Sequence, residues 1–267
     1  MSELLRIAVA VPAAGREQAI ARLLQLAPGG WEEVERAGAV ELAVYGDEAL
    51  AERVRSVFPQ AASVPVPAGW EDGWRAFHRP LEVAGLWIGP PWERPPAHPR
   101  AVVVDPGRAF GTGSHPTTRL CVELLAWLDR RGSLLDAGCG SGVLSIAALR
   151  LGYAPVLAAD LDPLAVAAAR ANAAANGVDL DVRLLDAVEA SLPATDVVAA
   201  NIELATVERL LARVGATVAV TSGYLVSQRP RVPGWRLLER RRLDGWAADA
   251  LVQERPAAHD LPGAGSV

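Results

Sequence analysis

Apolar and polar positions change their period several times over residues 1–64. Alternating positions indicate half-buried strands at residues 4–11, 31–36, 39–45 and 61–66. Helical spacing predicts helices at residues 15–27, ended by Pro28-Gly29-Gly30, and from the capping residue Asp47 to residue 58. This βαββαβ order predicts a small ferredoxin-like α+β domain at residues 1–64.

Residues 65–99 are rich in Pro and Trp, including Trp70, Trp74, Trp87 and Trp92. So many breakers of regular structure predict a connector between two domains. The aromatic rings could form a recognition surface, but packing onto one or both domains is favoured because Trp is commonly buried for structural reasons.

From residue 100 onward, apolar strands alternate with amphipathic helices. Strands are predicted at residues 133–137, 155–159, 180–184, 195–200 and 216–221, and helices at residues 142–151, 162–176 and 203–213. This alternation predicts an α/β domain at residues 100–255, with a parallel sheet that helices cover on both faces. Residues 235–240 and 246–253 predict an antiparallel hairpin at one sheet edge, and the tail 256–267 is expected to fray.

Composition narrows the protein class. Hydrophobic residues make up 51% of the 267 residues, the net charge is -5, and all 26 basic residues are Arg. This balance excludes a disordered chain and argues against strong direct binding of nucleic acid, which needs a basic face. Only Cys121 and Cys139 occur, no signal sequence is recognisable, and no apolar run approaches the roughly 18 residues of a membrane helix. We therefore expect a cytoplasmic protein without a membrane segment, a disulfide framework or a metal site.

A glycine-rich turn follows the first strand of the α/β domain, in LLDAGCGSGVLSIAALRLG. The apolar strand runs into Asp136, and glycines at 138, 140 and 142 let backbone amides approach a ligand at the start of a helix. The G-x-G-x-G spacing is one residue tighter than the dinucleotide motif, which favours S-adenosylmethionine over NAD. Asp136, Gly138 and Gly140 are therefore candidate cofactor-binding residues, although tight turns also need glycine for steric reasons.

Acidic residues follow the next two strands. Asp160, in ADLDP, lies where a carboxylate can accept both hydroxyls of a ribose, and the alternative is a solvated loop charge. Asp162 is expected only to cap the next helix. Asp186 could face an adenine edge or be an ordinary loop acid, and neither is favoured.

Two longer segments, DPGRAFGTGSHPTT at residues 105–118 and DVVAANIELA at residues 196–205, carry a close resemblance. The chain resembles the ribosomal protein L-eleven methyltransferase family (PrmA), with support from GGWEEVER, PPWE, ADLDP and SGYL. The resemblance implies a Rossmann-like, seven-stranded class I methyltransferase sheet. It also implies that Thr118, Gly138, Asp160 and Asn201 contact S-adenosylmethionine.

The residues of the first segment agree with this implication. Phe110, Gly111 and Thr112 belong to a bend with little side-chain bulk that could fold over the methionine end of the cofactor, with Phe110 stacking, or could be a mere connection. Thr117 and Thr118 would open the following helix with hydroxyls available to a carboxylate or an amine. His115 could be a base, but a structural hydrogen bond is favoured.

Asn201 leaves an apolar strand at its carboxyl end, where ligands of open α/β sheets bind. Its amide could hold the cofactor, orient the incoming amine, or do both. The alternative is a residue that caps the helix beginning near Glu203. Asn201, Thr117 and His115 are the candidate catalytic residues.

The resemblance implies an enzyme that methylates lysine ε-amino groups and the N-terminal α-amino group of ribosomal protein L-eleven, which the small domain would grip. We expect the enzyme to be a monomer. Another protein's lysine or glutamine, or a small molecule, stays open as acceptor; Asn201-Ile202 in place of Asn-Pro-Pro-Tyr argues against glutamine. An NAD oxidoreductase fails on glycine spacing. Segments after Asn201 and Leu225 are shorter than the family pattern, which puts the sheet edge in question and allows a binding protein with weakened catalysis.

Overall fold

The computed structural model describes residues 4–27, 31–36, 38–66, 79–93, 95, 97, 100–105, 115–129 and 131–254. The chain divides into two compact units, with the described residues as far as Arg79 in the first and those from Pro80 onward in the second. Within the described part, no helix has the length and apolar character that crossing a bilayer requires.

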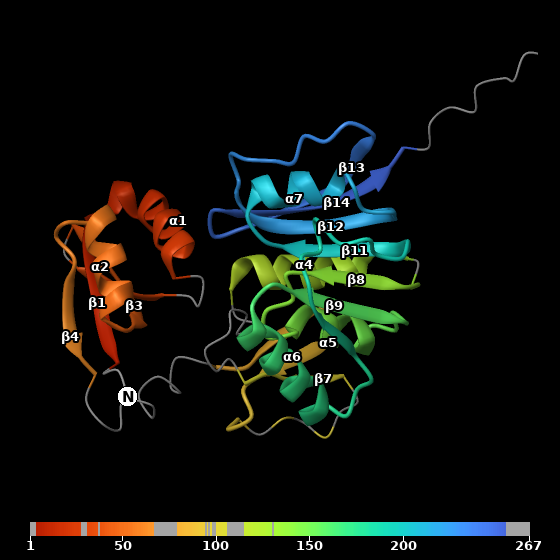
Figure 1. Cartoon of the computed structure of the whole chain (residues 1–267), viewed down its shortest axis with the longest axis horizontal. Coiled ribbons are helices and arrows are strands. Elements are labelled where there is room, and N and C mark those ends of the chain that lie inside the picture. Colours follow the sequence, from red (N-terminus) through yellow and green to blue (C-terminus); the bar gives the residue numbers. More distant parts are fainter. Residues whose placement is uncertain are drawn as a thin grey trace, which may run out of the picture. The chain divides into compact units, whose positions relative to one another are not determined.

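The first unit is a four-stranded antiparallel sheet with two α-helices (Figure 1). Its elements are β1 (Leu5–Pro12), a 3-10 turn η1 (Ala13–Gly15), α1 (Arg16–Leu26), β2 (Glu32–Arg36), β3 (Ala39–Gly46), α2 (Glu48–Val57) and β4 (Ala62–Pro65). The strand order is β2-β3-β1-β4. The element order is therefore the βαββαβ order expected from the sequence.

Alternation in β1 explains how this unit buries its core. Ile7 and Val9 are fully buried, whereas Ala8 between them is partly exposed, so one face of the strand packs against the helices. The predicted cap of α2 is confirmed, because the Asp47 side chain accepts a hydrogen bond from the backbone N–H of Leu50 at 3.0 Å.

The second unit contains a seven-stranded, mostly parallel sheet in the order β10-β9-β8-β11-β12-β14-β13. Its strands are β8 (Leu134–Ala137), β9 (Val156–Asp160), β10 (Asp181–Leu184), β11 (Thr195–Asn201), β12 (Ala216–Leu225), β13 (Trp235–Leu243) and β14 (Trp246–Gln253). Its helices are α4 (Pro116–Trp127), α5 (Val143–Arg150), α6 (Pro163–Ala175) and α7 (Leu204–Leu211). The predicted α/β sheet and its edge hairpin are confirmed. β14 and β13 form this edge, although the segments after Asn201 and Leu225 are shorter than the family pattern.

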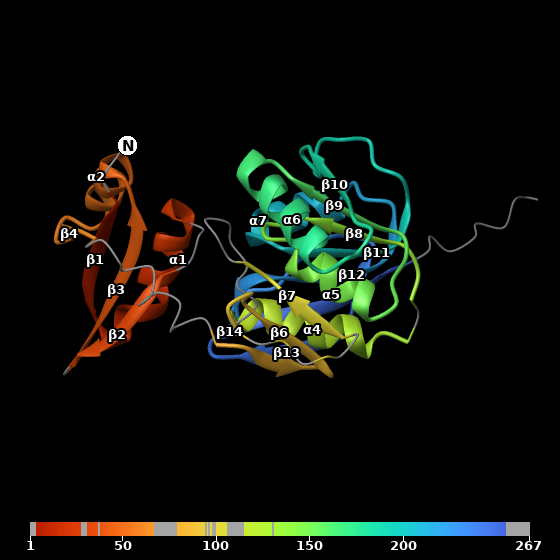
Figure 2. The same cartoon turned by 90° about the horizontal axis from the view of Figure 1, so that it is seen from below.

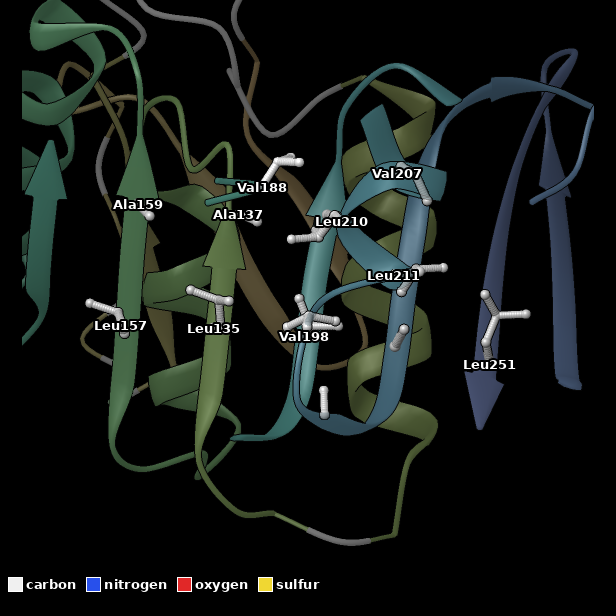
Figure 3. Packing of buried hydrophobic residues seen from close by; sticks show 14 residues of the cluster. Leu135, Ala137, Leu157, Ala159, Val188, Val198, Val207, Leu210, Leu211 and Leu251 are labelled. Atoms are coloured by element: carbon white, nitrogen blue, oxygen red, sulfur yellow. The ribbon is translucent and has the colours of Figure 1, made fainter. Parts of the chain in front are cut away.

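Strand parity shows that helices cover both faces of this sheet. On β9, Leu157 belongs to the hydrophobic cluster that contains Leu210 of α7, whereas the neighbouring Ala158 packs with Val166 of α6. Figure 3 shows the first cluster, in which side chains of β8, β9 and β11 share a face with those of α7. Because successive strand residues point to opposite faces, α6 and α7 lie on opposite sides.

The sequence predicted a connector without regular structure at residues 65–99, but the second half of this range contains two strands. β5 (Leu81–Val83) and β6 (Leu86–Gly89) pair antiparallel, and β6 pairs parallel with β7 (Ala101–Val103), as Figure 2 shows for β6 and β7. Leu86 and Ile88 are buried. These residues therefore form a small sheet of the second unit. Trp70 and Trp74 lie outside the described residues.

Candidate functional site

The carboxyl ends of β8, β9 and β11 meet at one edge of the sheet, because the three strands are parallel neighbours (Figures 1 and 2). Ligands of open α/β sheets bind at this edge. The sequence candidates Asp136, Gly138, Asp160 and Asn201 all lie at or just after these strand ends.

The glycine turn after β8 is pinned to β9 through the backbone. The N–H groups of Gly138 and Cys139 both donate to the carbonyl of Ala159, at 2.8 and 3.0 Å. Gly138, Gly140 and Gly142 have φ angles of 77°, 54° and 80°, which residues with a Cβ rarely adopt. The three glycines are thus required by the backbone conformation itself.

Asp160 closes the same turn from the end of β9. Its Oδ2 accepts a hydrogen bond from Gly140 N at 2.8 Å, and its Oδ1 accepts one from Asp162 N at 3.0 Å. The Asp160 carboxylate is therefore hydrogen-bonded to the turn, and its contact with a ribose stays a prediction. Each carboxylate oxygen can accept a second hydrogen bond, so the group can still bind a diol. Asp162 caps α6 as predicted, by accepting from Leu164 N at 2.8 Å.

Asp136 is buried beneath the start of α5 rather than open to a ligand. The Ser145 hydroxyl donates to its Oδ2, and its Oδ1 has no hydrogen-bond partner among the described residues. Burial is the main reason why the pKa of Asp136 is raised to about 6, and the nearby charge of Asp160 adds to the shift. A buried carboxyl group that takes up a proton more readily than a free aspartic acid therefore lies beneath the turn.

Asn201 faces α4 across the sheet edge. Its Nδ2 lies 3.4 Å from Oγ1 of the buried Thr118, to which it donates a long hydrogen bond. Helix α7 begins at Leu204 after Glu203, so the alternative that Asn201 caps this helix is wrong. The interaction with Thr118 joins the end of β11 to the first turn of α4.

Ile202 is held between two positions without side chains, which the sequence did not reveal. A Cβ on Gly138 would lie 2.5 Å from Cγ2 of Ile202, and a Cβ on Gly223 would clash with the Ile202 carbonyl oxygen. Ile202 N also donates to Ser222 O at 3.1 Å. The SGYL segment, residues 222–225, therefore holds the Asn201-Ile202 backbone in place. The sequence contained both the SGYL and the DVVAANIELA motif, but it did not indicate that the two are in contact.

His115 has the structural hydrogen bonds that were favoured for it. It is the N-cap of α4, its Nδ1 accepts from Thr117 N at 3.3 Å, and the same Nδ1 lies 2.7 Å from the Thr117 hydroxyl. Its ring packs edge-on against Trp246, with centroids 5.1 Å apart. Burial lowers the pKa of His115 to about 4, so the ring is neutral at pH 7.

The remaining candidates lie apart or outside the described residues. Asp186 Oδ1 accepts from Val188 N at 2.8 Å and so stabilises a turn, in keeping with an ordinary loop acid. A contact of Asp186 with adenine stays a prediction. Phe110, Gly111 and Thr112 lie outside the described residues.

Comparison with known proteins finds a family match that includes most of the second unit. Residues 60–248 match the family model "Ribosomal protein L11 methyltransferase (PrmA)". A ribosomal protein L11 methyltransferase of Symbiobacterium thermophilum is 38% identical over 194 residues, which cover 67% of this chain and 64% of the relative. That of Geobacter metallireducens is 39% identical over 218 residues, covering 76% and 70%. The chain thus spans about two thirds of the length of these relatives.

A solved structure agrees in fold. The crystal structure of a ribosomal protein L11 methylase from Lactobacillus delbrueckii subsp. bulgaricus is 28% identical, with a TM-score of 0.58. The match covers 64% of this chain and 95% of that one.

Gly223→Ala tests the support of the Asn201-Ile202 step. With φ at 99° and the Ile202 carbonyl in the way, we expect the free energy of unfolding to fall by about 2–4 kcal/mol. Gly234→Ala is the matched control, because Gly234 has φ at 80° but open space around it, and should cost only about 1 kcal/mol. Equal losses in urea unfolding of the two variants would contradict the account.

The raised pKa of Asp136 predicts a specific pH dependence of stability. Because the folded pKa is about 6 and the unfolded one 3.8, the stabilisation from this group is fully present below pH 3.8 and lost as the pH rises through 6. From pH 4.5 to 7.5, the unfolding free energy of the wild type should fall by about 2 kcal/mol relative to Asp136→Asn. Urea unfolding of both proteins measures this difference, and a constant difference would refute the assignment.

Proposed function

The chain belongs to the ribosomal protein L11 methyltransferase family, and we propose from this that it transfers methyl groups from S-adenosylmethionine to lysine ε-amino groups and the N-terminal α-amino group of ribosomal protein L11. The observation that carries the proposal is the glycine turn, in which the N–H of Gly140 donates a hydrogen bond to the Asp160 carboxylate. The proposed enzyme is a protein-lysine N-methyltransferase that acts in the cytoplasm, where ribosomal proteins are made.

The residues at the strand ends fit S-adenosylmethionine. Gly138 and Gly140 add no side chain of their own to the turn, and Asp160 has acceptor capacity for the two ribose hydroxyls. Thr118 and Asn201 would complete the contacts. We keep Phe110, Gly111, Thr112 and Asp186 as predicted contacts in the same site, whereas the buried Asp136 would support the turn from below without touching the cofactor. When bound, the cofactor supplies a methyl group on a positively charged sulfur, which a neutral amine can attack.

The side chains of the chain itself would align the acceptor rather than ionise it. Because Asn201 Nδ2 is directed to Thr118, its carboxamide oxygen is the group that would accept a hydrogen bond from the incoming amine. An ammonium group has no lone pair, and desolvation at the sheet edge would favour the neutral amine by lowering its pKa. Alignment and exclusion of water then supply most of the rate enhancement.

The geometry supports positioning roles for His115 and Thr117. An imidazole whose pKa is about 4 is a poor base for an amine, and its Nδ1 already accepts from Thr117. The Thr117 hydroxyl in turn lies 2.7 Å from that nitrogen. We propose that the pair fixes the start of α4, on which Thr118 faces Asn201.

We further propose that the first unit recognises ribosomal protein L11 and that the chain acts as a monomer. Residues 1–59 lie outside the family match, and those of them that the structure describes belong to the first compact unit, as a separate recognition domain would. The net charge of -5 suits a basic protein partner better than nucleic acid.

Transfer of label to ribosomal protein L11 tests the proposed activity. We expect the purified chain to add radiolabelled methyl groups to unmodified L11, with mass increments of one methyl group per transfer. Because the chain contains no lysine, label on lysine must lie in the acceptor. L11 acetylated beforehand at its amines is the control and should stay unlabelled. Labelling of the acetylated protein, or of another protein in place of L11, would contradict the proposal.

Asp160→Asn tests the proposed ribose contact. The loss of charged hydrogen bonds of about 1.5–3 kcal/mol should weaken binding of S-adenosylmethionine roughly 10- to 100-fold, as measured by titration calorimetry. Asp162→Asn is the matched control two residues away, because the Asp162 side chain caps α6 through Leu164 N and Asn also caps helices well. Equal affinities of the two variants would exclude the assigned role of Asp160.

A further inference from the structure

Side chains of α5, of α6 and of Asn176, which follows α6, take the place of a neighbouring strand along the side of residues 101–105 opposite β6. Arg150 Nε donates to Ala101 O at 3.2 Å. Asn176 accepts from Val103 N at 2.8 Å and donates to Val103 O at 2.6 Å. Asn172 does the same for Asp105, at 2.9 and 3.2 Å. Alternate residues of this segment are thus bonded as a neighbouring strand would bond them.

Asn172 makes one contact that Asn176 does not. Its Nδ2 also donates to the carbonyl of Ser141, at 2.9 Å, inside the glycine turn. The N–H of the same peptide group, that of Gly142, donates to Cys139 O at 2.8 Å. Both polar atoms of the Ser141-Gly142 peptide are therefore held, and the orientation of the turn depends on Asn172.

The surroundings of Asn172 make these hydrogen bonds necessary. Its side chain is buried in a helix that otherwise consists mostly of alanine, and a buried amide without partners destabilises a protein. Close packing limits movement as well, since a Cβ on Gly142 would lie 3.1 Å from that of Ala169, one turn earlier on α6. The sequence showed only two asparagines four residues apart, which gave no indication of partners about 70 positions away.

We propose that Asn172 is a positioning residue for S-adenosylmethionine. It joins three backbone segments: Asp105, the Ser141-Gly142 peptide and α6. Through these bonds it holds the glycine turn in the conformation in which Gly140 N–H reaches Asp160. The inference rests on the proposed function and assigns to Asn172 an effect on cofactor affinity rather than on the transfer step.

Asn172→Ala and Asn176→Ala in the full chain separate this role from general support of residues 101–105. Each variant removes two bonds to that segment, but only Asn172→Ala also removes the hydrogen bond to the Ser141 carbonyl. Both should lower the thermal midpoint. In calorimetric titration below both midpoints, Asn172→Ala should weaken binding of S-adenosylmethionine at least tenfold, and Asn176→Ala less than twofold. In turnover, Asn172→Ala should raise KM for the cofactor and change kcat less than threefold.

Unchanged affinity in Asn172→Ala, or equal weakening in both variants, would overturn the inference. If Asn172→Ala does not fold, Asn172→Asp keeps the shape and the oxygen that accepts from Asp105 N but removes both donated bonds, and the same tenfold loss is expected. A wild-type chain that is folded but does not bind S-adenosylmethionine would refute the proposed function itself. Wild-type binding with equal affinity in the Asn172 variants would refute only this inference.

Discussion

The hydrogen bond from Gly140 N to the Asp160 carboxylate joins the ends of two parallel strands at the point where a ligand can approach both. The bond can form only because the chain turns through left-handed conformations at Gly138, Gly140 and Gly142. Two further N–H groups of the turn share the carbonyl of Ala159, so the turn has little freedom relative to β9. A backbone held in this way presents its remaining polar groups without a large entropy cost on binding.

The other parts of the site are supported by contacts between distant segments. The Asn201-Ile202 step is held by Gly138 on one side and Gly223 on the other, so the glycine turn and the end of β12 jointly place the amide of Asn201. The start of α4 is held by His115 and meets Asn201 through Thr118. In the proposed methyl transfer, these neutral side chains would align the acceptor amine and the Asp160 carboxylate would bind the cofactor, since the proposed chemistry needs alignment more than acid or base catalysis.

Much of this architecture could be predicted from the sequence because it is local. The strand and helix periods, the caps at Asp47 and Asp162, and the glycine turn each depend on neighbouring residues, and the structure confirms them. β5 and β6 were missed because strands of three or four residues among prolines and tryptophans give a weak pattern. The roles of Ile202, Gly223 and Asn172 could not be predicted, because each depends on a partner far away in the sequence.

The backbone amide of Gly140 gives the most direct test of the account. In nuclear magnetic resonance spectra of the full chain, titration with S-adenosylmethionine should shift the amide resonances of Gly138 and Gly140 until one equivalent is bound, whereas NAD should leave them in place. Resonances of these two glycines that do not move with S-adenosylmethionine, in a chain whose other resonances show a folded state, would contradict the account.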